Sequence, residues 1–212
     1  MEKTVNRPKV KICGLTRIED ADFLNEAGAD YAGFVFYEKS RRNVSLKKAA
    51  EIAAHLSADI KKVAVMVSPE PAFVKEIETL GFDILQVHGT FKTEVKEMTA
   101  LPIWRAVNIS DTDTLEELFA GNRESIEGYV ADGAGYGGGK PFDWEVCSSR
   151  VRALSKGKKL ILAGGLDAEN VRTGIRYFHP DVVDVSSSVE EDGKKSRQKI
   201  EEFIRKVRKD EQ

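Results

Sequence analysis

Two side chains of this 212-residue chain could exchange protons with a ligand, the thiol of Cys13 and the carboxyl group of Asp132. Each ends a short run of strand-forming residues, KVKIC and EGYVAD. Residues two apart on a strand point to the same side, so Lys11 would bring an ammonium near the Cys13 thiol, and a nearby cation favours the thiolate. A carboxyl group screened from water has a raised pKa and can act as a general acid near neutral pH. Asp132 is therefore a candidate acid, and Cys13 a candidate base or nucleophile.

Each of these residues also has a purely structural interpretation. A cysteine at an arbitrary position is more often buried and inert, and Asp132 could equally cap a turn. The place of Cys13 at the end of a predicted strand favours a functional role. Cys147 lies inside a predicted helix, and there we expect an inert thiol.

Glycine and serine residues follow the last two predicted strands and indicate an anion site. The segment LAGGLDAENV places Gly164 and Gly165 where backbone N–H groups can approach a phosphate, just before a helix N-terminus. The segment DVSSSVE adds Ser186, Ser187 and Ser188. The alternative is that the glycines only permit turns and the serines only cap a helix. Together with the acid and the base, the pattern predicts proton transfer on a sugar phosphate.

Eight alternating strand and helix segments would position these residues. The predicted strands begin near residues 9, 31, 61, 84, 102, 128, 159 and 181, and a helical segment follows each one. The fourth helix, in TFKTEVKEM, is short and weak, so seven units are the alternative. No Pro/Gly/Ser linker interrupts the series, which predicts a single domain over residues 1–212.

This alternation is typical of an α/β protein, either a closed (β/α)8 TIM barrel or a long doubly wound sheet. The barrel is favoured because the first strand carries no Gly-rich dinucleotide fingerprint and eight strands can close. In such a barrel the functional groups lie at the carboxyl ends of the strands. Those ends carry Cys13, Arg42, Gln86, His88, Arg105, Asn108, Asp132, Gly164, Gly165, Asp184 and Ser186 to Ser188.

Composition excludes several classes of protein. The 33 Lys and Arg residues against 35 Asp and Glu give a net charge of −2, which argues against nucleic acid and membrane surfaces as partners. The chain has no apolar run long enough for a membrane helix and no signal-like N-terminus, so we expect a cytoplasmic protein with free thiols. The histidines His55, His88 and His179 are dispersed, so we expect no metal site.

Six motifs resemble those of one enzyme family: VKICGLTR at 10–17, GFVFYEKSRR at 33–42, LQVHG at 85–89, ADGAGYGGGKPFDW at 131–144, AGGLDAENV at 163–171 and VDVSSSVE at 183–190. In order and spacing they resemble the phosphoribosylanthranilate isomerases, barrel enzymes of tryptophan biosynthesis. The resemblance spans essentially the whole chain. KICG is its most specific part, because related barrels of histidine biosynthesis have a carboxylate where Cys13 stands.

The resemblance implies an Amadori rearrangement of a small-molecule substrate without a cofactor. Asp132 would be the general acid, Cys13 the general base, and Arg42 the residue that holds the anthranilate carboxylate. Backbone around the glycine and serine segments would bind phosphate. The predicted substrate-binding residues are Arg42, Gln86, His88, Gly164, Gly165, Asp184, Ser186, Ser187 and Ser188.

Three departures from the family pattern bear on binding. The usual KSPR is KSRR here, so Arg41 competes with Arg42 for the carboxylate role, and we favour Arg42. Tyr136, Gly138 and Pro141 alter the glycine-rich loop that could form a lid. Ser188 stands where the family has glycine, and phosphate affinity should suffer if that position needs a positive φ.

Two alternatives to the isomerase remain. One is a broader aminoaldose-phosphate isomerase that also accepts the histidine-pathway substrate, and the other is a catalytically silent barrel that binds a phosphorylated ligand. The sequence leaves the oligomeric state open between monomer and homodimer.

Overall fold

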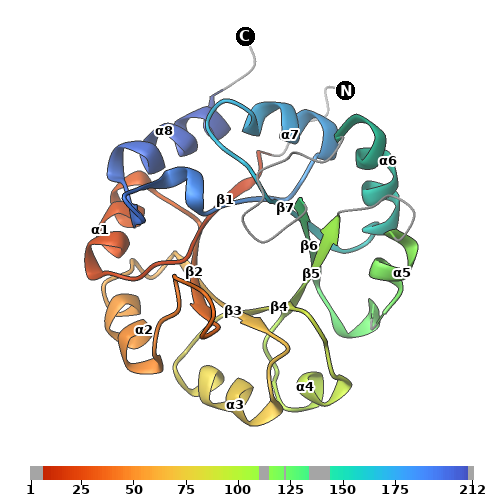
Figure 1. Cartoon of the computed structure of the whole chain (residues 1–212), viewed down its shortest axis with the longest axis horizontal. Helices are drawn as coiled ribbons and strands as arrows, with labels where there is room; N and C mark the ends of the chain where they lie inside the picture. Colours follow the sequence, from red (N-terminus) through yellow and green to blue (C-terminus); the bar gives the residue numbers. More distant parts are fainter. Residues whose placement is uncertain (1–6, 110–114, 122, 134–143, 210–212) are drawn as a thin grey trace.

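The strands of the protein close into a ring with the helices outside it, as seen down the barrel in Figure 1. The computed structural model describes residues 7–109, 115–121, 123–133 and 144–209. Within these residues, β1 to β8 pair in sequence order and are parallel, and β8 pairs with β1. The predicted closed (β/α)8 barrel is confirmed, and neither the open sheet nor the seven-unit alternative holds.

The barrel strands begin within one residue of the predicted positions. They are β1 Lys9–Cys13, β2 Tyr31–Phe36, β3 Lys61–Val67, β4 Ile84–His88, β5 Ile103–Ile109, β6 Gly128–Gly133, β7 Lys159–Ala163 and β8 Val182–Val185. The helices are α1 Ile18–Ala27, α2 Leu46–Ala53, α3 Pro71–Thr79, α4 Thr93–Glu97, α5 Leu115–Ala120, α6 Trp144–Leu154, α7 Val171–Phe178 and α8 Arg197–Arg208, with short 3-10 turns η1 Arg123–Ser125 and η2 Ser187–Val189. The weak fourth helix exists, but it is only five residues long.

Two apolar layers follow from the alternation of side chains along each strand. One layer fills the barrel, where Trp104 is fully buried and meets Tyr31 edge to face at 5.2 Å between ring centroids. The other lies between strands and helices and includes Val10 and Ile12 of β1 and the buried Cys147 of α6. Because Val10 and Ile12 face outward, Lys11 and Cys13 face the barrel interior.

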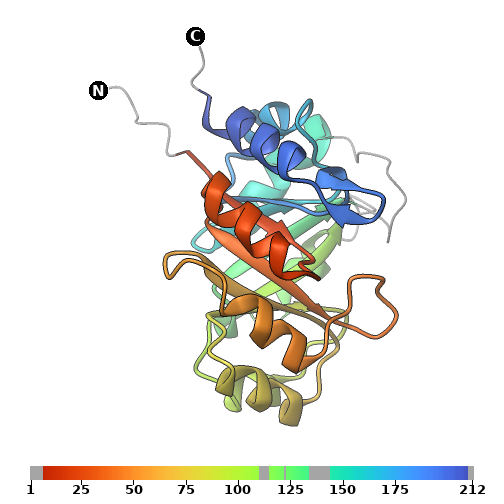
Figure 2. The same ribbon diagram turned by 90° about the vertical axis from the view of Figure 1, so that its left-hand side faces the viewer.

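Helix α8 shows why the helices stay on the outside. Its buried residues are Ile200, Phe203, Ile204 and Val207, which recur at the spacing of one helix face. The remaining positions are mostly charged and face solvent. In Figure 2 the blue helix α8 lies beside the red helix α1, which closes the outer layer between the two ends of the chain.

The last βα connection differs from the sequence expectation. The charged segment KKSRQKIEEFIRKVRK, residues 194–209, has a helical pattern throughout, but the helix begins only at Arg197, and Lys194–Lys195 forms a short strand, β10. This strand pairs with β9, Glu190–Glu191, in an antiparallel hairpin that turns at Asp192 and Gly193, both with positive φ. In Figure 2 the hairpin projects from the same end of the barrel as the loop between β2 and α2.

Candidate active site

A cavity of about 880 Å³ opens at the carboxyl ends of the strands. All the predicted site residues except Ser188 line it, together with Arg41, Arg105 and Asn108. Residues far apart in the sequence therefore meet at one mouth, as the barrel fold requires.

Cys13 is the last residue of β1 and lines this cavity. The strand beneath it carries Lys11, whose fully buried ammonium forms an ion pair with Asp184 of β8 at 2.7 Å. Lys11 and Asp184 are direct neighbours in the β1–β8 register. A Cβ on Gly33 of β2 would lie 2.8 Å from Cys13 Sγ and 3.1 Å from Lys11 Nζ. Because Gly33 has no side chain, the Cys13 thiol and the Lys11 ammonium both fit beside β2.

The charges around the thiol act in opposite directions. Burial raises the pKa of Cys13 above its ordinary value, while Lys11 lowers it and Asp184 raises it further. Burial by itself lowers the pKa of Lys11, but Asp184 and Cys13 outweigh this and raise it, so Lys11 stays protonated at neutral pH. A fixed positive charge therefore lies under Cys13, as the strand periodicity predicts.

Asp132 lies near the end of β6, across the mouth from Cys13, with β7 and β8 between their strands. Burial, and then the charge of Asp184, raise the pKa of Asp132 to about 6. A carboxyl group with this pKa is protonated in about a tenth of the molecules at pH 7, far more than at its ordinary pKa, and can give a proton to a ligand. Acid and base candidates therefore face the same space.

Gln86 and His88 extend from β4 into the mouth. The Gln86 amide donates to His88 Nε2 at 3.0 Å, and burial, followed by the charges of Lys11 and Arg105, lowers the pKa of His88 to about 4. His88 is therefore neutral at physiological pH, with Nε2 as an acceptor. Gln86 Oε1 and Asp184 Oδ1 are buried and find no hydrogen-bond partner among the described residues. Both atoms are suited to accept from ligand hydroxyl groups.

The glycine and serine segments lie side by side at the rim. Gly164 and Gly165 follow β7 with φ of 81° and 69°, and Ser186 and Ser187 follow β8. Ser188 lies outside the cavity lining, and its hydroxyl donates to the Leu166 carbonyl. Its φ is not positive, so serine at this position carries no left-handed backbone strain.

Arg42 lies over the mouth from the loop between β2 and α2. A Cβ on Gly14, the residue after Cys13, would overlap Cδ of Arg42, so the arginine stem packs on that glycine. Its guanidinium forms a two-pronged ion pair with Glu190 of β9, Nε to Oε1 at 2.6 Å and Nη2 to Oε2 at 2.9 Å. Arg41 also reaches Glu190, at 2.6 Å, but its side chain is 60% exposed against 20% for Arg42.

Sequence reasoning missed Glu190 and Lys195 as site residues. Glu190 stands in the last recognised motif, but nothing in the motif shows that its carboxylate reaches Arg42. Lys195 falls within a run of charged residues that reads as a solvated helix face, yet its side chain is only 1% exposed. Only the hairpin fold, which pairs Lys195 with Glu190, distinguishes them from their charged neighbours.

Tyr136, Gly138 and Pro141 lie outside the described residues. The described helices include none that is long and apolar enough to cross a membrane.

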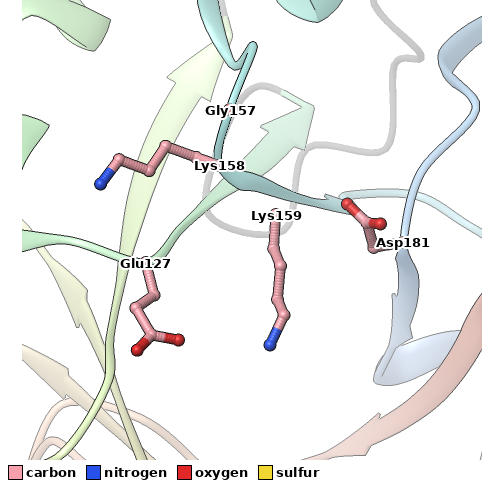
Figure 3. Close-up of a pocket in the computed structure, with 5 residues that line it drawn as sticks. All are labelled: Glu127, Gly157, Lys158, Lys159 and Asp181. Atoms are coloured by element: carbon pink, nitrogen blue, oxygen red, sulfur yellow. The ribbon is translucent and has the colours of Figure 1, made fainter.

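A second hollow, of about 450 Å³, lies at the opposite end of the barrel, where strands begin (Figure 3). It is lined by Glu127, Gly157, Lys158, Lys159 and Asp181. Lys158 and Asp181 form hydrogen bonds with the backbone. Lys158 Nζ donates to the Ile126 carbonyl, and Asp181 Oδ2 accepts from the Leu160 amide. These contacts close turns, and none of the predicted site residues lies there.

The fold and the mouth define a (β/α)8-barrel enzyme of the acid–base isomerase class. The family model described as N-(5'phosphoribosyl)anthranilate (PRA) isomerase matches residues 10–206, and the chain belongs to that family. A relative named N-(5'-phosphoribosyl)anthranilate isomerase, from Clostridium kluyveri, is 40% identical over 202 residues, covering 94% of this chain and 98% of the relative. The resemblance of the six motifs is thereby confirmed.

Solved structures agree with this assignment. A crystal structure of phosphoribosyl anthranilate isomerase from Thermotoga maritima has a TM-score of 0.84 and 35% identity, covering 94% of this chain and 98% of that one. Another, of phosphoribosyl anthranilate isomerase in complex with reduced 1-(o-carboxyphenylamino)-1-deoxyribulose 5-phosphate, has a TM-score of 0.82 and 34% identity with the same coverage.

Proposed function

We propose that this chain converts N-(5-phosphoribosyl)anthranilate into 1-(2-carboxyphenylamino)-1-deoxyribulose 5-phosphate, the Amadori step of tryptophan biosynthesis. The observation that supports it most directly is the meeting of Cys13 and Asp132 at one cavity in a chain of this family. No cofactor is required, because the reaction only moves protons and the electrons of bonds already present.

The reaction begins at Asp132, which gives its proton to the ring oxygen of the sugar. The C1′–O bond breaks, the nitrogen lone pair forms C1′=N, and a positive iminium results. That charge makes the C2′ proton acidic enough for the Cys13 thiolate to remove it. The electrons of the C2′–H bond form the C1′=C2′ bond of an enolamine as the C1′=N π electrons return to nitrogen and neutralise it. The enolamine then tautomerises to the C2′ ketone, losing the proton of its C2′ hydroxyl group and gaining one at C1′. Acid and base are each regenerated by exchange with solvent.

Binding uses the two ends of the substrate. Arg42 holds the anthranilate carboxylate, a task suited to its fork of donors, and backbone around Gly164, Gly165, Ser186 and Ser187 binds the phosphate, whereas Ser188 lies outside the cavity. Between them, Gln86, His88 and Asp184 contact the sugar. Arg42 is preferred to Arg41 because its stem packs on Gly14, beside the base, and its guanidinium is the less exposed of the two.

The test is the loss of phosphoribosylanthranilate fluorescence when the protein is added to substrate generated in place. Cys13→Ser and Asp132→Asn should each lower turnover by about 10²- to 10⁴-fold with folding preserved. Cys147→Ala, which removes the other buried thiol, is the matched control and should stay active. An active Cys13→Ser enzyme would refute the role of the base.

The same assay separates the alternatives. A wild-type protein that binds a phosphorylated analogue tightly without turnover would be a silent binding barrel. Turnover of the histidine-pathway aminoaldose at a comparable kcat/KM would make it the broader isomerase.

Organisation and location are part of the proposal. We infer one barrel domain over the whole chain, acting in the cytoplasm on a small-molecule substrate as a monomer or homodimer. Cys13 is a free thiol, which is consistent with a reducing compartment. Sedimentation velocity of the full chain distinguishes the two oligomeric states.

A further inference from the structure

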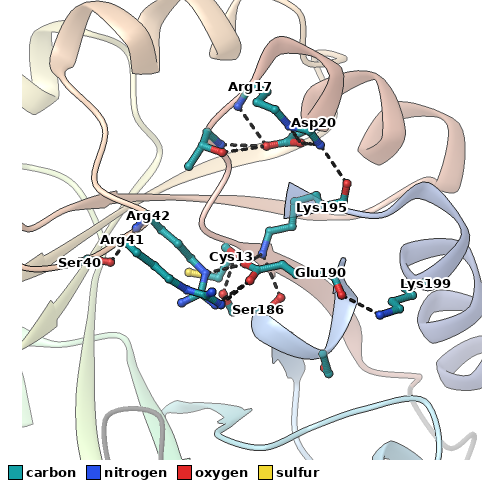
Figure 4. Close-up of polar contacts among 12 residues, drawn as sticks. Cys13, Arg17, Asp20, Ser40, Arg41, Arg42, Ser186, Glu190, Lys195 and Lys199 are labelled. Atoms are coloured by element: carbon teal, nitrogen blue, oxygen red, sulfur yellow. Dashed lines mark hydrogen bonds and ion pairs between the residues drawn. The ribbon is translucent and has the colours of Figure 1, made fainter. Parts of the chain in front are cut away.

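Glu190 joins three cations near the mouth of the barrel (Figure 4). Its carboxylate accepts from Arg42 in the two-pronged arrangement, from Arg41 at 2.6 Å and from Lys195 at 2.8 Å. The Glu190 side chain is 5% exposed. Three positive groups thus share one negative group, and the cluster keeps a net positive charge toward the cavity that Arg41 and Arg42 line.

The cluster is anchored from behind by the hairpin. Lys195 Nζ donates both to Glu190 and, at 2.9 Å, to the Ser186 carbonyl, and Lys199 Nζ donates to the Glu190 carbonyl at 2.7 Å. On the other side, Arg17 donates to the Lys195 carbonyl at 2.9 Å. The position of Glu190 is therefore fixed independently of Arg42. If the carboxylate moved away, the buried ammonium of Lys195 would lose its ion-pair partner.

Contacts of the same hairpin reach the base. The Ser186 hydroxyl donates to the Cys13 carbonyl at 2.9 Å, so Lys195 connects Glu190 with the end of β1 through Ser186. Arg42 is fixed to that strand end from the other side by Gly14. One network thereby sets the distance between the arginine and the thiol.

The orientation of Arg42 follows from which of its nitrogens are engaged. Within the described residues, its side-chain hydrogen bonds go to Glu190 alone, through Nε and Nη2. A planar guanidinium has two edges that can each take a carboxylate in parallel, the Nε–Nη edge and the Nη–Nη edge. Glu190 fills the first, which leaves the second for a ligand.

We propose that Glu190, anchored by Lys195, is a positioning residue that holds Arg42 so that its Nη1–Nη2 edge binds the carboxylate on the aromatic ring of the substrate. This inference rests on the proposed function, because it assumes that Arg42 meets that carboxylate. It adds that specificity for a ring bearing an ortho carboxylate depends on a residue that does not line the cavity.

The experiment compares two ligands by calorimetry on the full chain. One is reduced 1-(o-carboxyphenylamino)-1-deoxyribulose 5-phosphate, and the other is the same compound without the ring carboxylate. Glu190→Gln keeps the shape of the side chain but has no negative charge to hold Arg41, Arg42 and Lys195 in place. It should raise Kd for the carboxylated ligand about 10-fold and leave Kd for the other within about twofold. Glu190→Asp should raise Kd for the carboxylated ligand by a similar factor, because the shorter side chain cannot reach Arg42 and Lys195 at once.

Two controls test whether Glu190 acts on ligand binding through Arg42. Glu26→Gln removes a comparable arginine-paired carboxylate on the outer surface, where Arg197 Nη1 lies 2.5 Å from Glu26 Oε2, and should change neither Kd. In an Arg42→Ala background, Glu190→Gln should have no further effect on the carboxylated ligand, because the residue through which it acts is gone.

Each other outcome overturns the proposal. Tighter binding of the carboxylated ligand by Glu190→Gln would show that Glu190 competes with substrate for Arg42. Equal weakening of both ligands would show a general structural role, and full binding by Glu190→Asp would show that charge alone matters. If wild-type protein binds neither ligand, the proposed function itself fails, and the positioning role fails with it.

Discussion

The Asp132 carboxyl group packs against the bare Cα of Gly164, so closely that a Cβ at position 164 would lie 2.5 Å from Asp132 Oδ1. Gly164 also has a φ of 81°, a conformation that side chains disfavour. The same glycine therefore permits the turn after β7 and leaves room for the candidate acid.

Gly164→Ala should lower kcat by more than 10-fold as well as destabilise the fold, because the new methyl group displaces Asp132. The left-handed backbone alone costs about 1–2 kcal/mol for a non-glycine residue. Gly157→Ala is the matched control, since Gly157 has a φ of 82° and nothing within 4 Å of its added Cβ. In a thermal unfolding measurement it should lose only the stability that the left-handed backbone costs, less than Gly164→Ala, whose Cβ would also overlap the Gly133 backbone nitrogen, and it should keep its kcat. Equal kcat in the two variants would refute the steric role of position 164.

In the pH profile of kcat/KM, the break at the lower pH should fall at the pKa of Asp132. The reaction needs a protonated Asp132, with a pKa of about 6, and an ionised Cys13, whose pKa burial raises. Below pH 6 only the thiolate fraction changes, so activity rises with pH. Above pH 6 the loss of protonated Asp132 balances the gain of thiolate, which predicts a plateau that ends at the pKa of Cys13. A steady rise through pH 7 to 8 would contradict this assignment of acid and base.

Lys11→Met should make Cys13 harder to ionise, because it removes the positive charge beneath the thiol. In a Cys147→Ala background, the midpoint of the pH dependence of iodoacetamide alkylation should move to higher pH. The variant should also lose about 3–5 kcal/mol of stability, since Asp184 is left buried without its partner. Lys11→Met with Asp184→Asn should regain much of the stability and only part of the shift in the alkylation midpoint, because the charge of Asp184 also raises the pKa of Cys13. An unchanged midpoint would exclude Lys11 from control of the thiol.

His88 should make the wild-type protein sensitive to mild acid. Its pKa falls to about 4 in the fold, against about 6.5 in an unfolded chain, so the unfolded state binds the extra proton between these values. The stability from neutral His88 is present above pH 6.5 and is lost as pH falls toward 4. By pH 5 the loss is roughly 2 kcal/mol relative to pH 7. Urea denaturation of wild type and His88→Gln at both pH values checks this, and an equal pH dependence of the two would contradict it.

The fold was largely predictable from the sequence because its signals are local. Each strand is a short apolar run, and each helix shows periodic apolar positions, as in the segment that forms α8. The short helix α4 does not interrupt the barrel, because closure depends on the pairing of β4 with β3 and β5 and not on the length of the helix that follows β4. The hairpin at Glu190–Lys195 was not predictable, since its two-residue strands carry no periodicity.

The sequence by itself determined the eightfold alternation, the candidate acid and base, and the family, because these depend on residue types and their order along the chain. The pairing of Lys11 with Asp184, the closeness of Asp132 to Gly164 and the anchoring of Arg42 by Glu190 were decided only by the tertiary structure. The physical reason is that these contacts join residues up to 173 positions apart. Barrel closure and strand register set their distances, and neither is encoded in any short segment of the chain.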